Sequence, residues 1–136
     1  MTLVLDGSVT LAWCFEDERT PEVLAVFERV VEEGAFAPAI WRYEVANALL
    51  MGQRRKRIDA GQRTALLQTL SELDVEEDRA PEGDPWGTTV QLADLHRLTV
   101  YDASHLELAQ RRRLPLATLD APLRAAAGKA AVKLLP

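Results

Sequence analysis

Short apolar runs alternate with amphipathic stretches along the whole chain. Runs such as Leu3-Val4-Leu5 are apolar without alternation, which is typical of a parallel strand buried on both faces. Stretches such as residues 21–33 place apolar residues at helical spacing instead, and they predict amphipathic helices. The pattern predicts strands at residues 2–5, 35–37, 98–101, 116–119 and 131–135, a short edge strand around Val75, and helices at residues 8–15, 21–33, 39–51, 60–73, 85–96, 102–113 and 121–127. Strands that alternate with helices in this way predict an α/β fold, a three-layer α/β/α sandwich with a mostly parallel central sheet.

Local signals mark the ends of several of these elements. Thr20-Pro21-Glu22 is a helix start, with a capping side chain, a proline at the first helical position and an acid in the first turn, and Gly34 ends this helix. We expect Asp59 to cap the helix at residues 60–73, and Pro81-Glu82-Gly83 predicts a turn. Because no internal repeat, low-complexity tract or linker divides the 136 residues, we expect one domain over residues 1–136.

Composition and charge narrow the class of protein. No apolar run approaches the roughly 20 residues of a membrane span, and residues 1–6 reach an acid without a basic region, unlike a signal peptide. Cys14 is the only cysteine and has apolar neighbours, so we expect a buried thiol, no disulfide and a reducing, cytoplasmic location. The formal net charge of −5 argues against a protein that holds nucleic acid by bulk electrostatics, but it allows an acidic metal site or a basic protein partner.

Four acidic residues are set apart by their position in the pattern. Asp6, Asp102 and Asp120 each follow an apolar run that ends where a helical pattern begins, and Glu44 lies inside an otherwise apolar helix. Each has a local alternative, because Asp102 and Asp120 could be helix N-caps and Asp6 could begin a turn. Glu44 could reach solvent from one end of its helix. Taken together, three strand-end acids repeat one arrangement, and parallel strands bring such ends to one edge of the sheet, so we predict a carboxylate pocket there.

Carboxylates gathered in this way repel one another, and some would protonate unless a cation holds them. Mg²⁺ and Mn²⁺ are the natural candidates because both take oxygen ligands and keep several waters. One or two such ions can activate water and stabilise a phosphate under in-line attack, so the pocket predicts phosphodiester hydrolysis. This chemistry requires no catalytic histidine, and the chain contains only His96 and His105.

Four motifs carry these acids: Leu-Val-Leu-Asp6-Gly-Ser8, Tyr43-Glu44-Val-Ala-Asn47-Ala-Leu, Tyr101-Asp102-Ala-Ser-His-Leu-Glu-Leu-Ala and Leu116-Ala-Thr118-Leu-Asp120. In their order and spacing they resemble the PIN-domain ribonucleases and, more narrowly, the VapC toxins of bacterial toxin–antitoxin pairs. The resemblance runs over essentially the whole chain. It implies a Mg²⁺-dependent endoribonuclease that acts on RNA, is held inactive by a cognate antitoxin and forms a homodimer.

The resemblance also implies roles for single residues. The catalytic and metal-binding quartet would be Asp6, Glu44, Asp102 and Asp120, and the accessory polar positions would be Ser8, Asn47 and Thr118. The chain departs from the family at Gly7, where alanine is frequent, and we expect this change to loosen the turn without removing chemistry. His105 stands where an aromatic residue is common, and we assign it no catalytic role.

Basic and aromatic residues outside the motifs have two interpretations each. Arg54, Arg55, Lys56 and Arg57 form the densest positive charge, which either guides RNA phosphates toward the pocket or is a solvated helix end. Arg111, Arg112 and Arg113 end a predicted helix, where basic side chains suit the macrodipole, so a structural role is favoured. Trp13, Trp41, Tyr43 and Trp86 could stack on bases, but packing in the core or at an interface is the expected role.

Three other functions fit part of the pattern. A structure-specific DNA nuclease would use the same chemistry, but such enzymes usually carry added DNA-gripping segments for which this chain has no room. A catalytically silent PIN-like module that acts through protein contacts would keep the repulsion among four acids without benefit. A phosphoacceptor receiver domain would need a lysine beside the acids, and Lys129 and Lys133 do not sit at a convincing strand end.

Overall fold

A five-stranded sheet forms the centre of the computed structural model, which describes residues 2–79 and 85–136. The strands are β1 (Val4–Leu5), β2 (Ala35–Pro38), β3 (Val75–Asp78), β4 (Leu116–Ala117) and β5 (Leu134–Leu135), in the order β3-β2-β1-β4-β5. All neighbours are parallel, and Val4 pairs with Phe36 on one side and Leu116 on the other. The predicted parallel sheet is confirmed, and Val75 begins an edge strand as expected.

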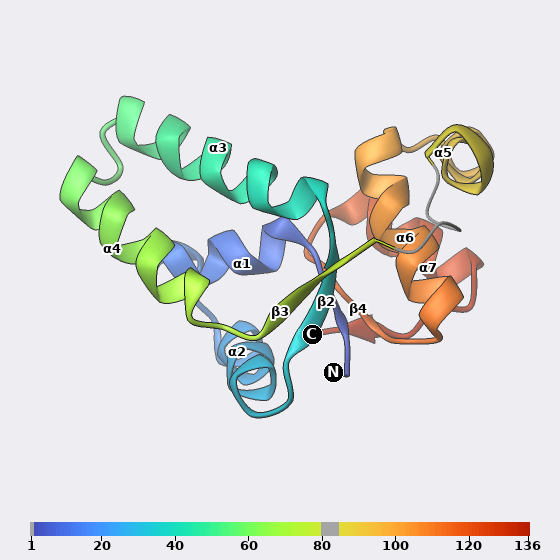
Figure 1. The fold of residues 1–136 in the computed structure, drawn as a ribbon, viewed down its shortest axis with the longest axis horizontal. Helices are drawn as coiled ribbons and strands as arrows, with labels where there is room; N and C mark the ends of the chain where they lie inside the picture. Colours follow the sequence, from blue (N-terminus) through green and yellow to red (C-terminus); the bar gives the residue numbers. More distant parts are fainter. Residues whose placement is uncertain (1, 80–84) are drawn as a thin grey trace.

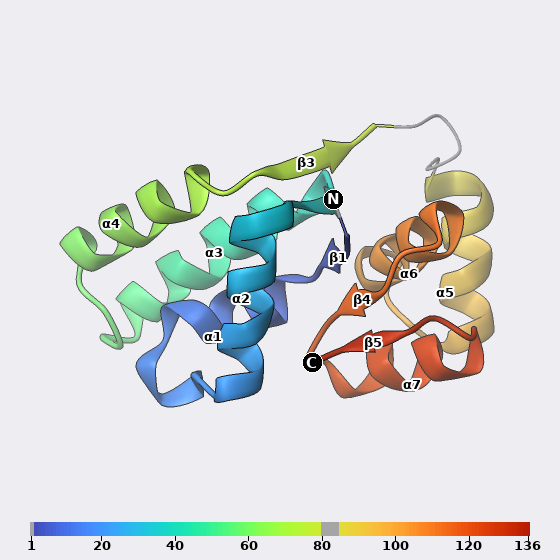
Figure 2. The ribbon, with the colours of Figure 1, turned by 90° about the horizontal axis from the view of Figure 1, so that it is seen from below.

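Helices cover both faces of this sheet. They are α1 (Gly7–Cys14), α2 (Pro21–Glu33), α3 (Ile40–Arg54), α4 (Ala60–Ser71), α5 (Val90–His96), α6 (Val100–Arg112) and α7 (Ala121–Lys129), with the short helical segments η1 (Glu16–Glu18) and η3 (Pro85–Thr89). Helices α1 to α4 lie on one side of the sheet and α5 to α7 on the other (Figures 1 and 2), which confirms the three-layer α/β/α arrangement. Within the described ranges, no helix is long and apolar enough to cross a membrane.

The alternating side chains of β1 separate two hydrophobic cores. Leu3 and Leu5 face the core shared with α1 to α4, whereas Val4 faces the opposite core with Leu106 and Leu123. All five side chains are fully buried. Because successive side chains of a strand point to opposite faces, a strand covered on both sides must be apolar at every position. This is why the first apolar run of the chain became the central strand.

The predicted signals at helix ends are confirmed at several positions. Thr20 caps α2 by accepting a hydrogen bond from the backbone N–H three residues on, at 3.2 Å, and Gly34 leaves the helix with a φ of 72°. Asp59 and Gln62 form a reciprocal capping box at the start of α4. Cys14 is buried as expected, and its burial raises the pKa of the thiol to about 11, so little thiolate forms near neutral pH.

The predicted strand at residues 98–101 is wrong. Helix α5 ends at His96, Arg97 takes a left-handed φ of 55°, and Thr99 is already the N-cap of α6. Leu98 packs against the core between α6 and α7, while Thr99 and Tyr101 are exposed. An apolar residue, a capping threonine and the first turn of a helix therefore produce an alternation that resembles a strand.

Smaller departures concern element ends. Strands β1, β4 and β5 each shrink to two residues, α3 continues to Arg54, and α4 stops at Ser71. Gly128 lies inside α7 instead of ending it. Val31 is 58 % exposed and does not join the buried stripe of α2. The turn predicted at residues 81–83 lies outside the described residues.

A buried ion-pair cluster joins the edge strand β3 to α6. Asp78, whose side chain is 5 % exposed, accepts hydrogen bonds from Arg111 and Arg112, and Arg111 also donates to Glu107 at 2.7 Å. Burial alone would raise the pKa of Asp78, but the hydrogen bonds and charges of the two arginines outweigh it and hold the pKa below its usual value. Arg112 also lies over the ring of Phe36, 4.0 Å from its centroid. The structural role expected for these two arginines is confirmed.

Candidate active site

Asp6 lies at the carboxyl end of the central strand, where the chain turns into α1, and it caps that helix. Its Oδ2 accepts hydrogen bonds from Ser8 Oγ at 2.6 Å and from Thr118 Oγ1 at 2.7 Å. The two hydroxyls in turn accept the backbone N–H groups of Leu119 and Asp120, at 2.9 Å and 3.1 Å. These bonds tie the end of β1 to the loop after β4. They fix the Asp6 carboxylate and leave its Oδ1 without a donor from the described residues.

His105 occupies the space between two of the predicted acids. It lies on α6, its ring is fully buried, and its Nδ1 is 3.0 Å from the carbonyl oxygen of Tyr101. Its Nε2 is 3.5 Å from Asp6 Oδ1 and 3.8 Å from Glu44 Oε1. Glu44 reaches this point from α3. Both His105 Nε2 and Glu44 Oε1 are buried atoms that lack a hydrogen-bond partner in the part of the chain that the structure describes.

Asp120 and Asp102 complete the acidic group from two further helix starts. Asp120 caps α7 by accepting the backbone N–H of Leu123 at 3.0 Å, as its local alternative expects. Asp102 is not a cap, because it lies in the first turn of α6 and its own N–H donates to Thr99 Oγ1 at 3.1 Å. The strand-end position expected for Asp102 is therefore wrong. A helix start, where the macrodipole favours a carboxylate, holds this residue instead.

Electrostatic interactions link the four acids to one another. Burial is the largest cause of the raised pKa of Glu44, and the charges of Asp6 and Asp102 raise it further. Burial also raises the pKa of Asp102, and the charges of Asp120 and Asp6 add to that effect. When its ring is protonated, His105 opposes the shift at both carboxyls. The structure thus brings the predicted quartet together, while the chemical roles of its members stay a prediction.

The accessory residues and the basic run differ in their distance from this group. Ser8 and Thr118 contact Asp6 directly, whereas Asn47 is exposed on α3 and its side chain makes no hydrogen bond within the described ranges. The basic run begins ten positions after Glu44 on the same helix, about 15 Å away at about 1.5 Å per residue. All four of its members are exposed.

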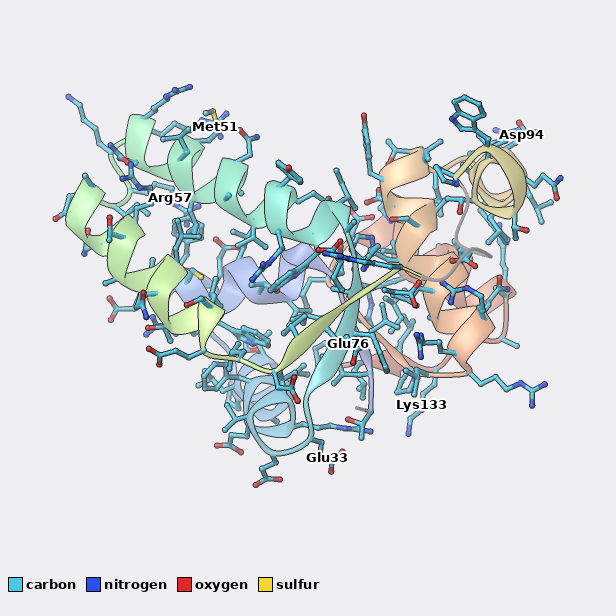
Figure 3. All side chains as sticks on the ribbon, in the orientation of Figure 1. Glu33, Met51, Arg57, Glu76, Asp94 and Lys133 are labelled. Atoms are coloured by element: carbon cyan, nitrogen blue, oxygen red, sulfur yellow. The ribbon has the colours of Figure 1, made fainter. Side chains whose placement is uncertain are left out.

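Arg57, the last member of the basic run, is held by neighbouring groups. It forms ion pairs of 3.0 Å and 3.1 Å with two acids of η1, and its guanidinium lies 3.9 Å from the centroid of the Phe15 ring. Figure 3 shows it at the end of the α3–α4 pair that lies away from α6. Arg57 therefore already has two acidic partners at the surface in this arrangement.

Of the four aromatic residues considered for base stacking, two are buried and two are exposed. Trp13 and Trp41 are buried, and their indole N–H groups donate to the Val23 carbonyl and to Thr10 Oγ1, so their expected core role is confirmed. Tyr43 is 77 % exposed and is not a core residue. Trp86 is 90 % exposed and also lies outside the core.

His105 is the residue of this site that the sequence analysis missed. The signal available in the sequence was its spacing, because it follows Asp102 by three positions on one helix, and such residues are neighbours on the helix surface. A buried histidine at that spacing from an acid of the site would be expected to face the same pocket.

The chemistry of these donors fits a divalent cation. Within residues 2–79 and 85–136, no three acidic, histidine or cysteine side chains converge closely enough to coordinate an ion as they stand. The donor set is nevertheless rich in carboxylate oxygen, which hard divalent ions prefer. Two of its buried atoms, Glu44 Oε1 and His105 Nε2, lack the partner that buried polar atoms normally have. A cation would supply that partner once the side chains turn toward it.

Comparisons with known proteins show the family and the fold of the chain. The family model described as PIN domain matches residues 3–129. The solved structure of PAE2754 from Pyrobaculum aerophilum is 27% identical, with a TM-score of 0.69 over 93% of this chain and 86% of that chain. FitAcB from Neisseria gonorrhoeae is 16% identical, with a TM-score of 0.67 over 98% of this chain and 96% of that one. VapBC2 from Rickettsia felis, solved with a DNA fragment from the promoter, is 11% identical, with a TM-score of 0.67 over 98% and 97%. The last two show the fold alone, and no curated protein sequence matches the chain.

Proposed function

The chain belongs to the PIN domain family, and from this premise we propose that it is a metal-dependent endoribonuclease that hydrolyses RNA phosphodiester bonds. One observation carries the proposal. Four carboxylates gather where the strands of a parallel sheet end, and one buried oxygen among them, Glu44 Oε1, lacks a hydrogen-bond partner among the described residues. Ligands of open α/β sheets bind at this edge. An acidic group with this charge has a use only if cations neutralise it, which favours an active nuclease over a silent module.

The carboxylates of Asp6, Glu44, Asp102 and Asp120 would hold Mg²⁺ or Mn²⁺ through oxygen. The bound ion supplies Lewis acidity, which activates water for attack on phosphorus and offsets the charge of the phosphate under attack. Asp6 is the rigid member of the group because Ser8 and Thr118 hold one of its oxygens. Glu44, whose side chain is 31 % exposed, has room to adjust to an ion or a substrate.

The partner in this proposal is a cognate antitoxin, and the protein is the toxin of a VapBC-type toxin–antitoxin pair. The four sequence motifs support this assignment, and solved proteins with the same fold include VapBC2 and FitAcB. In this role the protein acts on RNA in the cytoplasm as a homodimer. An open reading frame for a small DNA-binding protein beside the gene would support the pairing.

We expect the purified protein to cleave RNA in Mg²⁺ or Mn²⁺ and to stop when EDTA removes the ion, because its donors need a cation to act on phosphate. Gels of end-labelled RNA, and of single-stranded DNA of the same sequence, measure the cleavage. Glu44→Gln should lose the activity, whereas Glu76→Gln, which neutralises an exposed acid of β3, should keep it. Undiminished cleavage in excess EDTA would exclude the metal mechanism. A preference for DNA would favour a DNA nuclease.

Changing Arg54, Arg55 and Lys56 together to glutamine is expected to weaken RNA binding and flatten its salt dependence. If all three contact phosphate, the slope of log affinity against log salt falls by about 2, at about 0.7 per contact with a single strand. Fluorescence anisotropy of labelled RNA at several salt concentrations, in EDTA to prevent cleavage, measures the slope. Arg57→Gln is the matched control, since Arg57 is already paired with η1. An equal slope in all proteins would show that the run is a solvated helix end.

A further inference from the structure

The hydrogen-bond donors and acceptors around His105 are not matched, and packing does not explain why. A carbonyl oxygen can only accept, so the 3.0 Å contact with the Tyr101 carbonyl requires the proton of the neutral ring to be on Nδ1. The other nitrogen, Nε2, then carries a lone pair. It faces Asp6 Oδ1 at 3.5 Å and Glu44 Oε1 at 3.8 Å, which are acceptors as well when ionised. With the ring neutral, Nε2 and the two carboxylate oxygens are therefore all acceptors, and Nε2 and Glu44 Oε1 have no hydrogen-bond partner among the described residues.

We infer that His105 is a ligand of the metal, and that its Nε2 gives the site an imidazole nitrogen beside the oxygens of Asp6 and Glu44. This inference rests on the metal site of the proposed function. It differs from the all-carboxylate quartet that the sequence motifs imply, because it adds a nitrogen donor from a residue outside that quartet.

The separations around Nε2 suit an ion better than a hydrogen bond. They exceed the usual hydrogen-bond length of about 2.7–3.2 Å. An ion held at about 2.0–2.2 Å by each of two ligands can bridge atoms up to about 4.2 Å apart. The distances of 3.5 Å and 3.8 Å both fall within that reach. Binding then requires a modest turn of a side chain, and Glu44 has the room for it because its side chain is 31 % exposed.

The ring of His105 is already oriented as metal-binding histidines are. Such residues usually donate the N–H of the second ring nitrogen to a carbonyl or carboxylate, which fixes the tautomer and the ring plane. Here the Tyr101 carbonyl, one turn earlier on the same helix, accepts that N–H. On the opposite side, Ser8 and Thr118 hold Asp6 Oδ2, so Oδ1 is left facing the imidazole. Both partners are therefore fixed before an ion arrives.

A nitrogen ligand changes which ions the site prefers. Mg²⁺ and Mn²⁺ prefer oxygen ligands, whereas imidazole suits the later divalent metals of the first transition row. Loss of His105 should therefore weaken the binding of Co²⁺ by about tenfold or more, and weaken Mn²⁺ and Mg²⁺ by smaller factors. If the imidazole only fills space in the core, all three ions should change equally.

The test uses the intact protein loaded with Mn²⁺ and reads nitrogen coupling by pulsed electron paramagnetic resonance, with affinities for Mn²⁺, Co²⁺ and Mg²⁺ from calorimetry. The chain has two histidines, so His96→Gln is a matched control that leaves His105 as the only imidazole. His105→Phe keeps a buried ring and removes both nitrogens. We expect coupling in the parent and in His96→Gln, a changed coupling after ¹⁵N-histidine labelling, and none in His105→Phe.

The outcomes separate this inference from the proposed function. Mn²⁺ that binds without histidine coupling in the parent and in His96→Gln overturns the inference, and so does a failure to bind any of the ions. These two proteins decide the question even if His105→Phe does not fold. Histidine coupling without RNA cleavage would support the inference and contradict the ribonuclease. Metal-dependent RNA cleavage without histidine coupling would support the ribonuclease and contradict the inference.

Discussion

Asp102→Asn is expected to leave the metal-free protein as stable as the parent or more stable, and to reduce metal-dependent cleavage strongly. The variant keeps the start of α6, because the cap is Thr99 and the backbone N–H of residue 102 still reaches its hydroxyl. It removes one charge from a group in which Asp120 and Asp6 already raise the pKa of this carboxyl, second only to its burial. Less repulsion remains in the folded state.

The pH dependence of that gain follows from the direction of the shift. The folded pKa of Asp102 lies above its unfolded value of about 3.9, so its contribution to stability is fully present below about pH 3.9 and is lost as the pH rises through the folded pKa. Asp102→Asn lacks this carboxyl, so its stability does not fall as the pH rises through that pKa. Its advantage in thermal unfolding should therefore appear near neutral pH and fade as the pH is lowered toward about 4.

In saturating Mg²⁺ the parent should become more stable than Asp102→Asn. Mg²⁺ at about a hundred times its dissociation constant stabilises a protein that binds it by roughly 2.7 kcal/mol, and this increment should shrink in Asp102→Asn. Cleavage should fall by about two orders of magnitude or more, as when a group that stabilises charge in the transition state is removed. Asp94→Asn, on the neighbouring helix α5, is the control for losing an exposed aspartate (Figure 3). Parent-like Mg²⁺ stabilisation together with parent-like cleavage would remove Asp102 from the site.

Arg111→Met is expected to cost about 3 kcal/mol of unfolding free energy, near the lower end of about 3–5 kcal/mol for breaking a buried ion pair. Methionine keeps most of the apolar stem but leaves Asp78 and Glu107, with side chains 5 % and 6 % exposed, without their shared cation. The loss stays near the lower end because Arg112 still contacts Asp78. Urea unfolding measures it, and adding Glu107→Gln to the variant should recover part of the loss.

Lowering the pH should reduce the difference in unfolding free energy between the parent and Arg111→Met. The pKa of Asp78 is lowered in the folded protein, so its contribution is present above the unfolded value of about 3.9 and is lost as the pH falls through the folded pKa. Arg113→Asn is the control, because Arg113 is exposed, forms no ion pair within the described ranges and has a left-handed φ that asparagine tolerates. Equal stability of both variants across pH would show that the cluster contributes nothing.

The sequence predicts those parts of the fold that local signals determine. Asp6 and Asp120 could be placed because an apolar run, an acid and a helix start are consecutive in the chain at both positions. The start of α2 was equally clear from Thr20 and Pro21. In each case the residues that define the element also make its capping contacts.

The position of Asp102 could not be predicted in the same way. Val100 and Tyr101 favour a strand by their composition, and what decides against one is the packing of Leu98 beneath α6 together with the left-handed turn at Arg97. The contact between His105 and the acids is also non-local, since it joins the ends of β1, α3 and α6. No short window of sequence contains both sides of it.

The central place of β1 also determines when the acidic group can first form in a chain under synthesis. Val4 is made more than a hundred residues before its partner Leu116 and before Thr118, whose hydroxyl steadies Asp6. At about 5–20 residues per second, the ribosome needs roughly 6–20 s to cover that interval. Throughout it, Asp6 lacks its second donor and the acidic group lacks Asp120. A nascent chain therefore carries no complete acidic group until β4 has paired with β1 and residue 120 has been made.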